Sequence, residues 1–401
     1  MLRGGRLRHC LPAATHCAHI SERAVGYSRE VRRRASMPRH PWLAANARWG
    51  KQVIGVRVRC LCATMIGLAL VVSSCTAAPG PSLPGGPVEC ANGVTEPGQA
   101  SAALQQVRPG SIVCLSGDGL AGAELEVTTS GTPQQPITIV ADDATMRSLT
   151  VNADYVVIQG LTLRDGDGLT MAGRGLVARN NVIYNATADG VECRGCADTV
   201  IESNTVQRAD GTGIWIAGER ITVHNNTVSD SVLRTQGDAD GVRFFGNGHR
   251  LTRNTIKDIK ASGYPRGGPH TDCFQTYDTR DAPPTYDVII ADNVCTNVDV
   301  QALIATTDER RGGGAPPGQI AIVFEHNTVS VNGSQAVLLR NFPRVIVRNN
   351  RFSGSGDRAV MVTEGSTDCA VIDNTMTGNL RPIEIDPESE PGFQESGNTS
   401  R

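Results

Sequence analysis

An asparagine placed two positions before an apolar residue recurs along this chain at a nearly regular spacing. The copies are 23, 22, 28, 39, 34, 23 and 24 residues apart and begin at Asn181, Asn204, Asn226, Asn254, Asn293, Asn327, Asn350 and Asn374. A period in the low twenties with one Asn at a fixed phase is typical of a parallel β-solenoid, in which the Asn side chains of successive coils can form a hydrogen-bonded ladder inside a turn. The pattern predicts an all-β fold, a right-handed parallel β-helix of roughly ten coils.

The first 75 residues differ in composition from the rest of the chain. Residues 1–59 hold 13 of the 38 Lys and Arg but only two of the 40 Asp and Glu. An apolar run at residues 65–72 follows, and then small residues, which is the order found in a secretory signal. Residues 72–75, Val-Ser-Ser-Cys, resemble a bacterial lipobox, which implies lipid attachment at Cys75; an ordinary cleavage site is the alternative. We therefore predict a basic prefix with a lipoprotein-type signal peptide and an exported protein, either a cell-envelope lipoprotein or extracellular.

The remaining chain divides into three parts. Residues 76–88 are rich in Pro, Gly, Ser and Ala, which predicts a flexible linker. Residues 89–387 carry the β-rich repeats and form the predicted β-helix domain. Within it, residues 101–115 read as a short helix followed by a strand that together cap the open end of the solenoid. The polar residues 388–401 are expected to form a loose tail.

Export favours disulfide bonds, because these persist outside the cytoplasm. Cys90 and Cys114 bracket the segment that enters the solenoid, and we predict that they pair. Cys193 and Cys196 form a lone CxxC without the second pair that a zinc site needs, so a local crosslink or two buried thiols is expected there. We expect a monomer whose membrane contact is the lipid anchor alone.

Aligning the strand that follows each turn gives two columns of outward-facing side chains. Side chains alternate along a strand, so the residues on either side of an outward one point into the core. Aromatic rings on such a face suit the flat apolar faces of sugars, although an inserted turn could instead cover them. The predicted substrate-binding residues are Glu192, Trp215 and Gln275 in the first column, which also holds Arg243, and Phe245 and Tyr277 in the second.

The three longest spacings between Asn copies fall in the middle of the solenoid and require inserted loops. We place these loops at residues 232–240, 260–272 and 307–318. Insertions on one side of a repeat scaffold commonly wall a binding groove. The loops flank the strands that carry Trp215 and Arg243, so we predict a groove at these strands.

Asp240 and the His270-Thr271-Asp272 element precede equivalent strands on adjacent coils, which places the two aspartates about 5 Å apart. Carboxylates so close repel each other unless they share a proton, bind a cation or pair with Arg243. As acid and base they could hydrolyse a glycosidic bond, and together with Asp238 they could hold Ca²⁺. As turn-capping side chains they would be structural only. His270 favours a catalytic role, because histidine is well suited to move protons near neutral pH.

A second chemistry would use the basic residues of the same region. β-Elimination at a uronate needs a base, for which His270 is the candidate, and a positive group that neutralises the sugar carboxylate. Beyond the prefix the only lysines are Lys257 and Lys260, which lie in sequence between Arg243 and His270. Lys257 therefore joins Arg243 among the candidate catalytic residues; a solvated turn residue is the alternative.

Several segments resemble known β-helix enzymes. Residues 109–115 and 130–139 resemble the opening of the chondroitinase B/alginate lyase-like group, and the coils over residues 101–385 resemble the pectate-lyase superfold. Residues 270–275, His-Thr-Asp-Cys-Phe-Gln, resemble a His-x-Asp-x-x-Gln pattern of secreted β-helix proteins. The resemblance implies the fold and a polysaccharide partner. It does not supply the catalytic residues, since the Arg-x-Pro-x-x-Arg signature of pectate lyases and the paired Asp-Asp of polygalacturonase-type hydrolases are absent.

These observations predict an exported, carbohydrate-active enzyme, either a lyase on a uronate-containing glycan or a glycoside hydrolase, with Ca²⁺ as the one cofactor that the residues could bind. A non-catalytic glycan-binding or adhesion module of the cell envelope is the alternative, and a purely structural envelope protein is a third. Nucleic-acid binding is not expected, because the coils carry no basic face.

Overall fold

The computed structural model describes residues 90, 93–235, 237–264, 267–278, 282–307 and 315–401. The predicted signal segment, the lipidation site Cys75 and the linker at 76–88 lie outside these residues. Within the described part of the chain, no helix combines the length and apolar character needed to cross a membrane.

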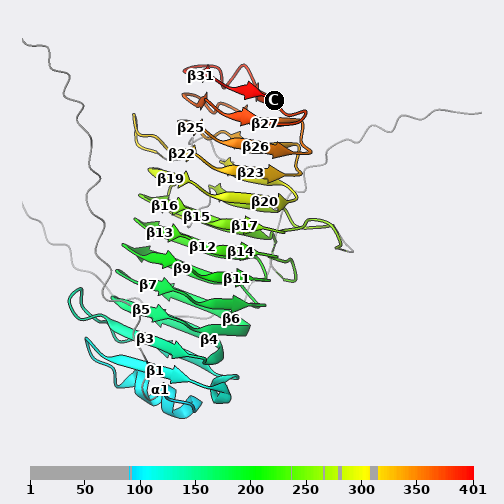
Figure 1. Ribbon diagram of the computed structural model, residues 1–401. Coiled ribbons are helices and arrows are strands. Elements are labelled where there is room, and N and C mark those ends of the chain that lie inside the picture. Colours follow the sequence, from blue (N-terminus) through cyan, green and yellow to red (C-terminus); the bar gives the residue numbers. More distant parts are fainter. Residues whose placement is uncertain (1–89, 91–92, 236, 265–266, 279–281, 308–314) are drawn as a thin grey trace, which may run out of the picture. The chain divides into compact units, whose positions relative to one another are not determined.

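The described residues form a parallel β-helix, as predicted (Figure 1). One face is a sheet of twelve strands, so the helix has about twelve coils rather than ten. Successive strands of this sheet pair in parallel, one from each coil. They are β1 (Ile112–Ser116), β3 (Ile137–Asp142), β5 (Val156–Gln159), β7 (Val177–Arg179), β10 (Val200–Glu202), β13 (Thr222–His224), β16 (Arg250–Thr252), β19 (Val288–Ala291), β22 (Ile322–Glu325), β25 (Val345–Arg348), β28 (Ala370–Ile372) and β31 (Gln394–Ser396).

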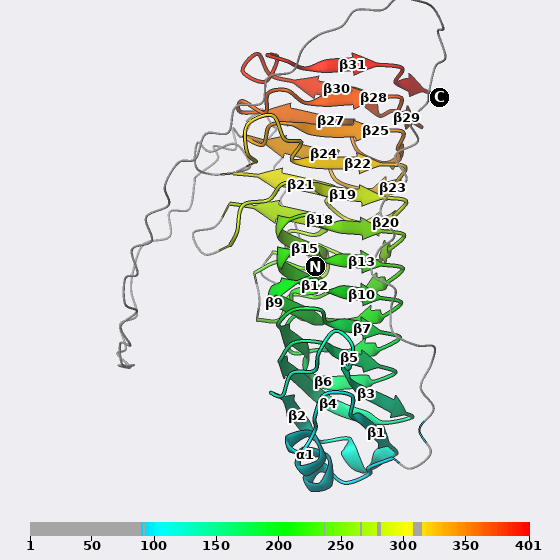
Figure 2. The same cartoon turned by 90° about the vertical axis from the view of Figure 1, so that its left-hand side faces the viewer.

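The other twenty strands complete the coils (Figure 2). The first three are β2 (Glu124–Val127), β4 (Thr145–Asn152) and β6 (Thr162–Ala172). From there on each coil except the last has two strands separated by a turn, which lie in two rows here called row 1 and row 2. Row 1 follows the asparagines and consists of β8 (Val182–Tyr184), β11 (Thr205–Gln207), β14 (Thr227–Ser229), β17 (Thr255–Lys257), β20 (Val294–Val298), β23 (Thr328–Val331), β26 (Arg351–Gly354), β29 (Thr375–Met376) and β32 (Thr399–Ser400). Row 2 consists of β9 (Val191–Ala197), β12 (Thr212–Glu219), β15 (Asp240–Asn247), β18 (Asp272–Tyr277), β21 (Gln301–Thr306), β24 (Gln335–Arg340), β27 (Arg358–Thr363) and β30 (Arg381–Ile385).

The asparagine ladder is confirmed. From Asn181 onward, each Asn side-chain nitrogen donates to the side-chain oxygen of the Asn one coil further on, over 2.9–3.1 Å. The same nitrogen also donates to a backbone carbonyl, as Asn254 does to Val223. The ladder therefore saturates a buried turn that would otherwise leave peptide groups without partners.

The ladder also corrects the expectation of a loose tail at 388–401. Asn374 donates to Asn398, and β31 and β32 pair with β28 and β29. The tail is thus a further coil. The sequence pattern hid it because Ser400 occupies the position that is apolar in the earlier copies, so the final coil keeps the hydrogen bonds of the repeat but not its core side chain.

A short helix caps the other end of the solenoid, as predicted, but it begins four residues earlier than expected. Helix α1 spans Pro97–Gln105 and buries Ala100 and Leu104 against β1 and β2. Pro97 explains the early start, because proline at the first helical position lacks only an N–H that would have no partner there. A 3₁₀ turn, η1 (Asp118–Leu120), follows β1.

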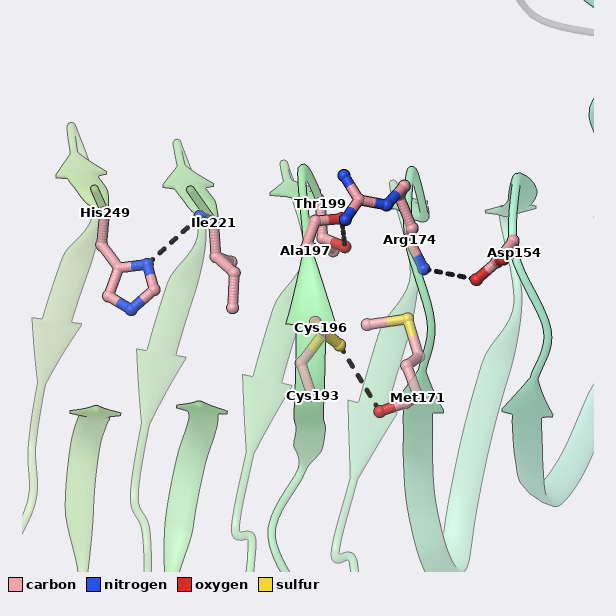
Figure 3. Close-up of a disulfide and its surroundings, with 9 residues drawn as sticks. All are labelled: Asp154, Met171, Arg174, Cys193, Cys196, Ala197, Thr199, Ile221 and His249. Atoms are coloured by element: carbon pink, nitrogen blue, oxygen red, sulfur yellow. Dashed lines mark hydrogen bonds between the residues drawn. A yellow bond between two sulfur atoms is a disulfide. The ribbon is translucent and has the colours of Figure 1, made fainter. Parts of the chain in front are cut away.

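Three disulfides lie in the described chain. Cys90–Cys114 is the predicted pair. Cys193–Cys196 is a local crosslink within β9, one of the two outcomes expected for the CxxC (Figure 3). The third, Cys273–Cys295, joins β18 to β20 and was not anticipated. Cys369 is buried and not in a disulfide.

Replacing Asn254 by Ala should destabilise the fold by about 3 kcal/mol, because each buried group left without a partner costs about 1–3 kcal/mol. The substitution removes the acceptor for both the backbone N–H and the side chain of Asn226 and the donor to Val223. Chemical denaturation followed by circular dichroism measures the loss. The matched control is Asn152→Ala, an exposed asparagine outside the ladder, for which less than about 0.5 kcal/mol is expected. Equal effects of the two substitutions would contradict a stabilising role for the ladder.

Candidate functional site

The register of row 2 brings the predicted outward column together. Trp215 pairs with Glu192 on one side and with Arg243 on the other, and Arg243 pairs with Gln275. Phe245 lies in β15 two residues after Arg243, in the second outward column, and pairs with Ala217. The predicted alternation of inward and outward residues is therefore confirmed for these strands.

A groove of about 690 Å³ runs along these strands. Its lining includes Asp189, Arg194, Trp215, Arg243, Tyr277 and Pro283. Gly237, in the inserted segment before β15, forms part of its wall. The predicted link between inserted segments and a groove on row 2 thus holds for the segment at 232–240.

The aromatic residues form a packed cluster rather than an open platform. The Trp215 and Phe245 ring centres are 5.4 Å apart, and Phe245 meets Tyr277 edge to face at 5.1 Å. Phe245 is only 1% exposed and Trp215 only 9%. Arg194 lies over the indole of Trp215 at 4.2 Å, and Ala282 packs against the cluster. Phe245 therefore supports the other two rings, and a sugar reaches Trp215 only at its edge unless Arg194 moves.

Arg243 lies between two aspartates. Its Nε donates to Asp240 Oδ2 at 3.1 Å, a terminal nitrogen contacts the same oxygen, and Asp238 Oδ2 is 3.6 Å away. Burial opposes the charge of Arg243, but Asp240, Tyr277 and Asp238 together outweigh burial, so the pKa of Arg243 is raised. The guanidinium stays charged and keeps 15% of its side chain exposed toward the groove.

Each aspartate in the column before row 2 uses one oxygen to cap the next coil. Oδ1 of Asp189 accepts from the backbone N–H of Thr212 at 2.8 Å, and Oδ1 of Asp240 accepts from that of Asp272 at 3.1 Å. Oδ1 of Asp272 accepts from the N–H of Gln301 at 3.1 Å. Oδ1 of each aspartate therefore has the turn-capping role that was one of the alternatives. Oδ2 of Asp240 and Asp272 is left to contact a charged partner.

For Asp272 that partner is His270. The Nδ1 atom of His270 lies 2.8 Å from Asp272 Oδ2, and the Gln275 amide nitrogen lies 3.4 Å from the same oxygen. The backbone oxygen of His270 accepts from Ala239, which holds the histidine beside Asp238 and Asp240. The side chain of Asp272 is fully buried, whereas that of His270 is 39% exposed. The contact with Asp272 thus uses Nδ1 of His270 and not Nε2, and Gln275, only 7% exposed, braces Asp272.

Burial and neighbouring charges shift the pKa of these groups toward neutrality or beyond. Burial raises the pKa of Asp240 to about 7, with Arg243 opposing and Asp272 adding to the rise. Burial also raises the pKa of Asp272, against the effect of His270. The hydrogen bond that His270 donates to Asp272 outweighs burial and raises the pKa of His270 to about 9. At neutral pH His270 therefore carries a proton on Nε2 that it can donate.

Two of the predicted roles depend on where Lys257 and the aspartate oxygens lie. Lys257 ends β17 in row 1, and its one ion pair among the described residues is with Asp258, at 4.0 Å. It does not join the His270 cluster because row 1 and row 2 are separated by a turn. In the described part of the chain no three His, Cys, Asp or Glu side chains converge as metal ligands, and Arg243 and His270 engage the oxygens that Ca²⁺ would need.

Two features of the site were missed. Asp189 lies in the groove, and burial raises its pKa; its place in the aspartate column was visible, but its exposure to the groove was not. The segment between β18 and β19 supplies Ala282 and Pro283. The spacing of 39 residues from Asn254 to Asn293 was the available signal, since it is long enough for two insertions, one on either side of β18.

Comparisons with known proteins agree with the fold. Residues 141–271 match the family described as right handed beta helix region. No curated protein matches the chain. The chain thus has the fold of a right-handed parallel β-helix.

Three solved structures illustrate the likeness. The catalytic unit of a thermostable GH87 alpha-1,3-glucanase from Streptomyces thermodiastaticus strain HF3-3 is 13% identical over 77% of this chain and 66% of that one, with a TM-score of 0.54. Pectate lyase Pel9A is 14% identical over 74% and 73%, with a TM-score of 0.47. An alginate lyase from Paenibacillus sp. str. FPU-7 is 14% identical over 76% and 98%, with a TM-score of 0.42. Identities this low show a shared fold and no more.

The pKa of His270 should depend on Asp272. Titration of histidine-labelled protein by NMR should place the pKa of His270 near 9, and Asp272→Asn should lower it toward 6.5 because the negative partner is lost. Because the pKa is raised in the folded state, the ion pair stabilises the fold fully below pH 6.5, and this contribution is lost as the pH rises through about 9. His224 serves as the internal control, because its Nδ1 forms a hydrogen bond with Thr252 and not with an aspartate. A His270 that titrates at its ordinary value in the wild type would contradict the pairing.

Proposed function

We propose that this protein is an exported enzyme that hydrolyses glycosidic bonds in a polysaccharide. The observation that carries the proposal is a partly exposed histidine held by a buried carboxylate, on the coil next to an arginine that lines a groove on row 2 and is held by a second buried carboxylate. Such an arrangement presents a proton donor and a fixed positive group to one ligand, which a purely structural solenoid does not need.

The charge balance favours hydrolysis over β-elimination. A lyase must neutralise a uronate carboxylate, but Arg243 already contacts Asp240 and Asp238, and Arg194 already binds Glu192. The surroundings are therefore more acidic than basic, which suits a neutral sugar and stabilises the positive charge of an oxocarbenium-like transition state. His270, protonated at neutral pH, is an acid there rather than the base that elimination requires.

Each residue then has a distinct role. His270 protonates the leaving oxygen through Nε2, and Asp272 orients its ring. Asp238, 34% exposed, activates the attacking water. Arg243, oriented by Asp240, binds sugar hydroxyls, and the edges of Trp215 and Tyr277 line the sugar path. Ca²⁺ held by Asp238, Asp240 and Asp272 would have to displace Arg243 and His270, so we assign these aspartates to proton transfer and positioning.

Export as a lipoprotein remains part of this proposal. Three disulfides are compatible with an oxidising compartment, and the lipobox-like segment ending at Cys75 would supply the anchor. The fold likeness to the alpha-1,3-glucanase agrees with a glycan-handling helix, but the proposal stands on the side chains of the groove.

A panel of neutral and acidic polysaccharides, incubated with the full chain with and without Ca²⁺ or EDTA, tests the reaction. We expect new reducing ends on a neutral glycan without absorbance from an unsaturated uronate. His270→Ala should lower turnover about 100-fold while glycan binding persists, because general acid catalysis contributes about 10²–10⁴-fold. Trp215→Ala should weaken glycan binding and serves as the contrasting variant. Unsaturated products would establish a lyase instead, and normal turnover by His270→Ala would refute the role of this residue.

The pH dependence separates the two reactions as well. If His270 acts as an acid, kcat/KM should fall as the pH rises through about 9, where the imidazolium loses its proton. If it acts as the base of an elimination, kcat/KM should rise over the same range. Rates measured on one substrate between pH 6 and about 10 decide between them.

A further inference from the structure

The turn between row 1 and row 2 follows one packing rule on most coils. A small residue comes directly after the position that Asp189, Asp240 and Asp272 occupy on their coils. This small residue packs against an apolar residue of row 1. A Cβ added to Gly213 would lie 2.2 Å from Val228, and one added to Gly241 would lie 2.5 Å from Ile256. The chain therefore passes so close to row 1 at this turn that only small side chains fit.

The coil that carries His270 and Asp272 departs from this rule. Cys273 occupies the small-residue position, since it follows Asp272 as Gly241 follows Asp240. Cys295 occupies the apolar position, opposite Ile256 in register. Where other coils have van der Waals contact, this coil has a buried disulfide.

Strand β18 of this coil is less fully paired on one side than its neighbours are. It pairs with β21 from Asp272 to Tyr277, but with β15 only at Phe274 and Gln275, whereas β15 pairs with β12 from Asp240 to Asn247. In the segments between β17 and β18 and between β18 and β19, the described residues form no strand. Asp272 is the first residue of β18, so its position depends on how this end of the strand is held.

We infer that the Cys273–Cys295 disulfide is a positioning element that fixes Asp272, and through it His270, in the site. The bond ties the residue next to Asp272 to β20, behind the carboxylate, while the backbone N–H of Gln301 holds its Oδ1 from the following coil. The effect on turnover rests on the proposed function, but the effect on the His270–Asp272 pair does not.

Loss of the disulfide is expected to change one specific contact, the hydrogen bond between Asp272 and His270. Without the bond, the start of β18 is held by the pairing of Asp272 with Gln301 and by the hydrogen bond from the Asp272 backbone N–H to Asp240 Oδ1, but its covalent tie to β20 is lost. A shift of Asp272 lengthens the 2.8 Å contact to His270 Nδ1 and leaves Asp240 and Asp238 as the remaining negative groups near the ring. The imidazolium then loses its main stabilising partner.

The double variant Cys273→Ala/Cys295→Val tests this inference. It copies the Ala302 and Val329 found at the same positions one coil further on, so the turn can pack without the bond. We expect the pKa of His270, measured by NMR in the full chain, to fall from about 9 toward 6.5. We expect kcat to fall about tenfold with KM within about twofold, because misplacement of a proton donor affects the reaction more than binding.

The matched control is Cys90→Ala/Cys114→Ala, which removes a disulfide at the capped end of the solenoid and should change neither quantity. A second variant, Cys273→Gly/Cys295→Ile, copies the pair Gly241 and Ile256 and guards against a packing defect of the first.

A folded double variant with an unchanged His270 titration overturns the inference, and so does loss of folding in both variants, which would make the bond a general structural requirement. A lowered pKa of His270 supports it even if no polysaccharide is cleaved by the wild type; that combination refutes the proposed function alone.

Discussion

The hydrogen bond from one asparagine side chain to the asparagine of the next coil sets the register on which every other contact depends. Because this bond is made inside a turn, it fixes how far each coil is rotated and displaced relative to its neighbour. Side chains at equivalent positions then stack in columns separated by one strand spacing, about 4.8 Å. The inner columns form the core, and the outer columns form the groove. A sequence that keeps the ladder can therefore vary its outer columns with little effect on the fold.

The aspartate column uses the same geometry for two purposes. Oδ1 of Asp240 and Asp272 completes the backbone hydrogen bonding of the following coil, which requires the side chain to be buried. A buried carboxylate is costly as an anion unless it has a cationic partner, and Arg243 and His270 are those partners. Burial of the capping oxygen thus accounts both for the raised pKa values of the two aspartates and for the placement of a basic group beside each of them.

The sequence alone predicted what repeats and missed what does not. The asparagine phase, the outward columns and the adjacency of Asp240 and Asp272 all follow from periodicity, and the structure confirms them. The course of inserted segments has no such period, so the packing of Ala282 against the aromatic cluster could not be derived. Lys257 was assigned to the site because it is near in sequence, but a turn separates row 1 from row 2. The last coil was missed because its ladder Asn398 is followed by polar residues.

The packing of one coil on the next also bears on how such a protein can change over evolutionary time. Whole repeats can be gained or lost with the core intact, since each new coil meets the same surface that its predecessor met. The proposed site lacks this tolerance, because its groups come from consecutive coils. One extra repeat between β15 and β18 would move Asp240 and Asp272 apart by about a further 4.8 Å. Adding a coil at either end of the β-helix therefore leaves the site intact, whereas adding one at its centre disrupts it. Changes in the number of coils should for this reason be found on either side of the groove and not within it.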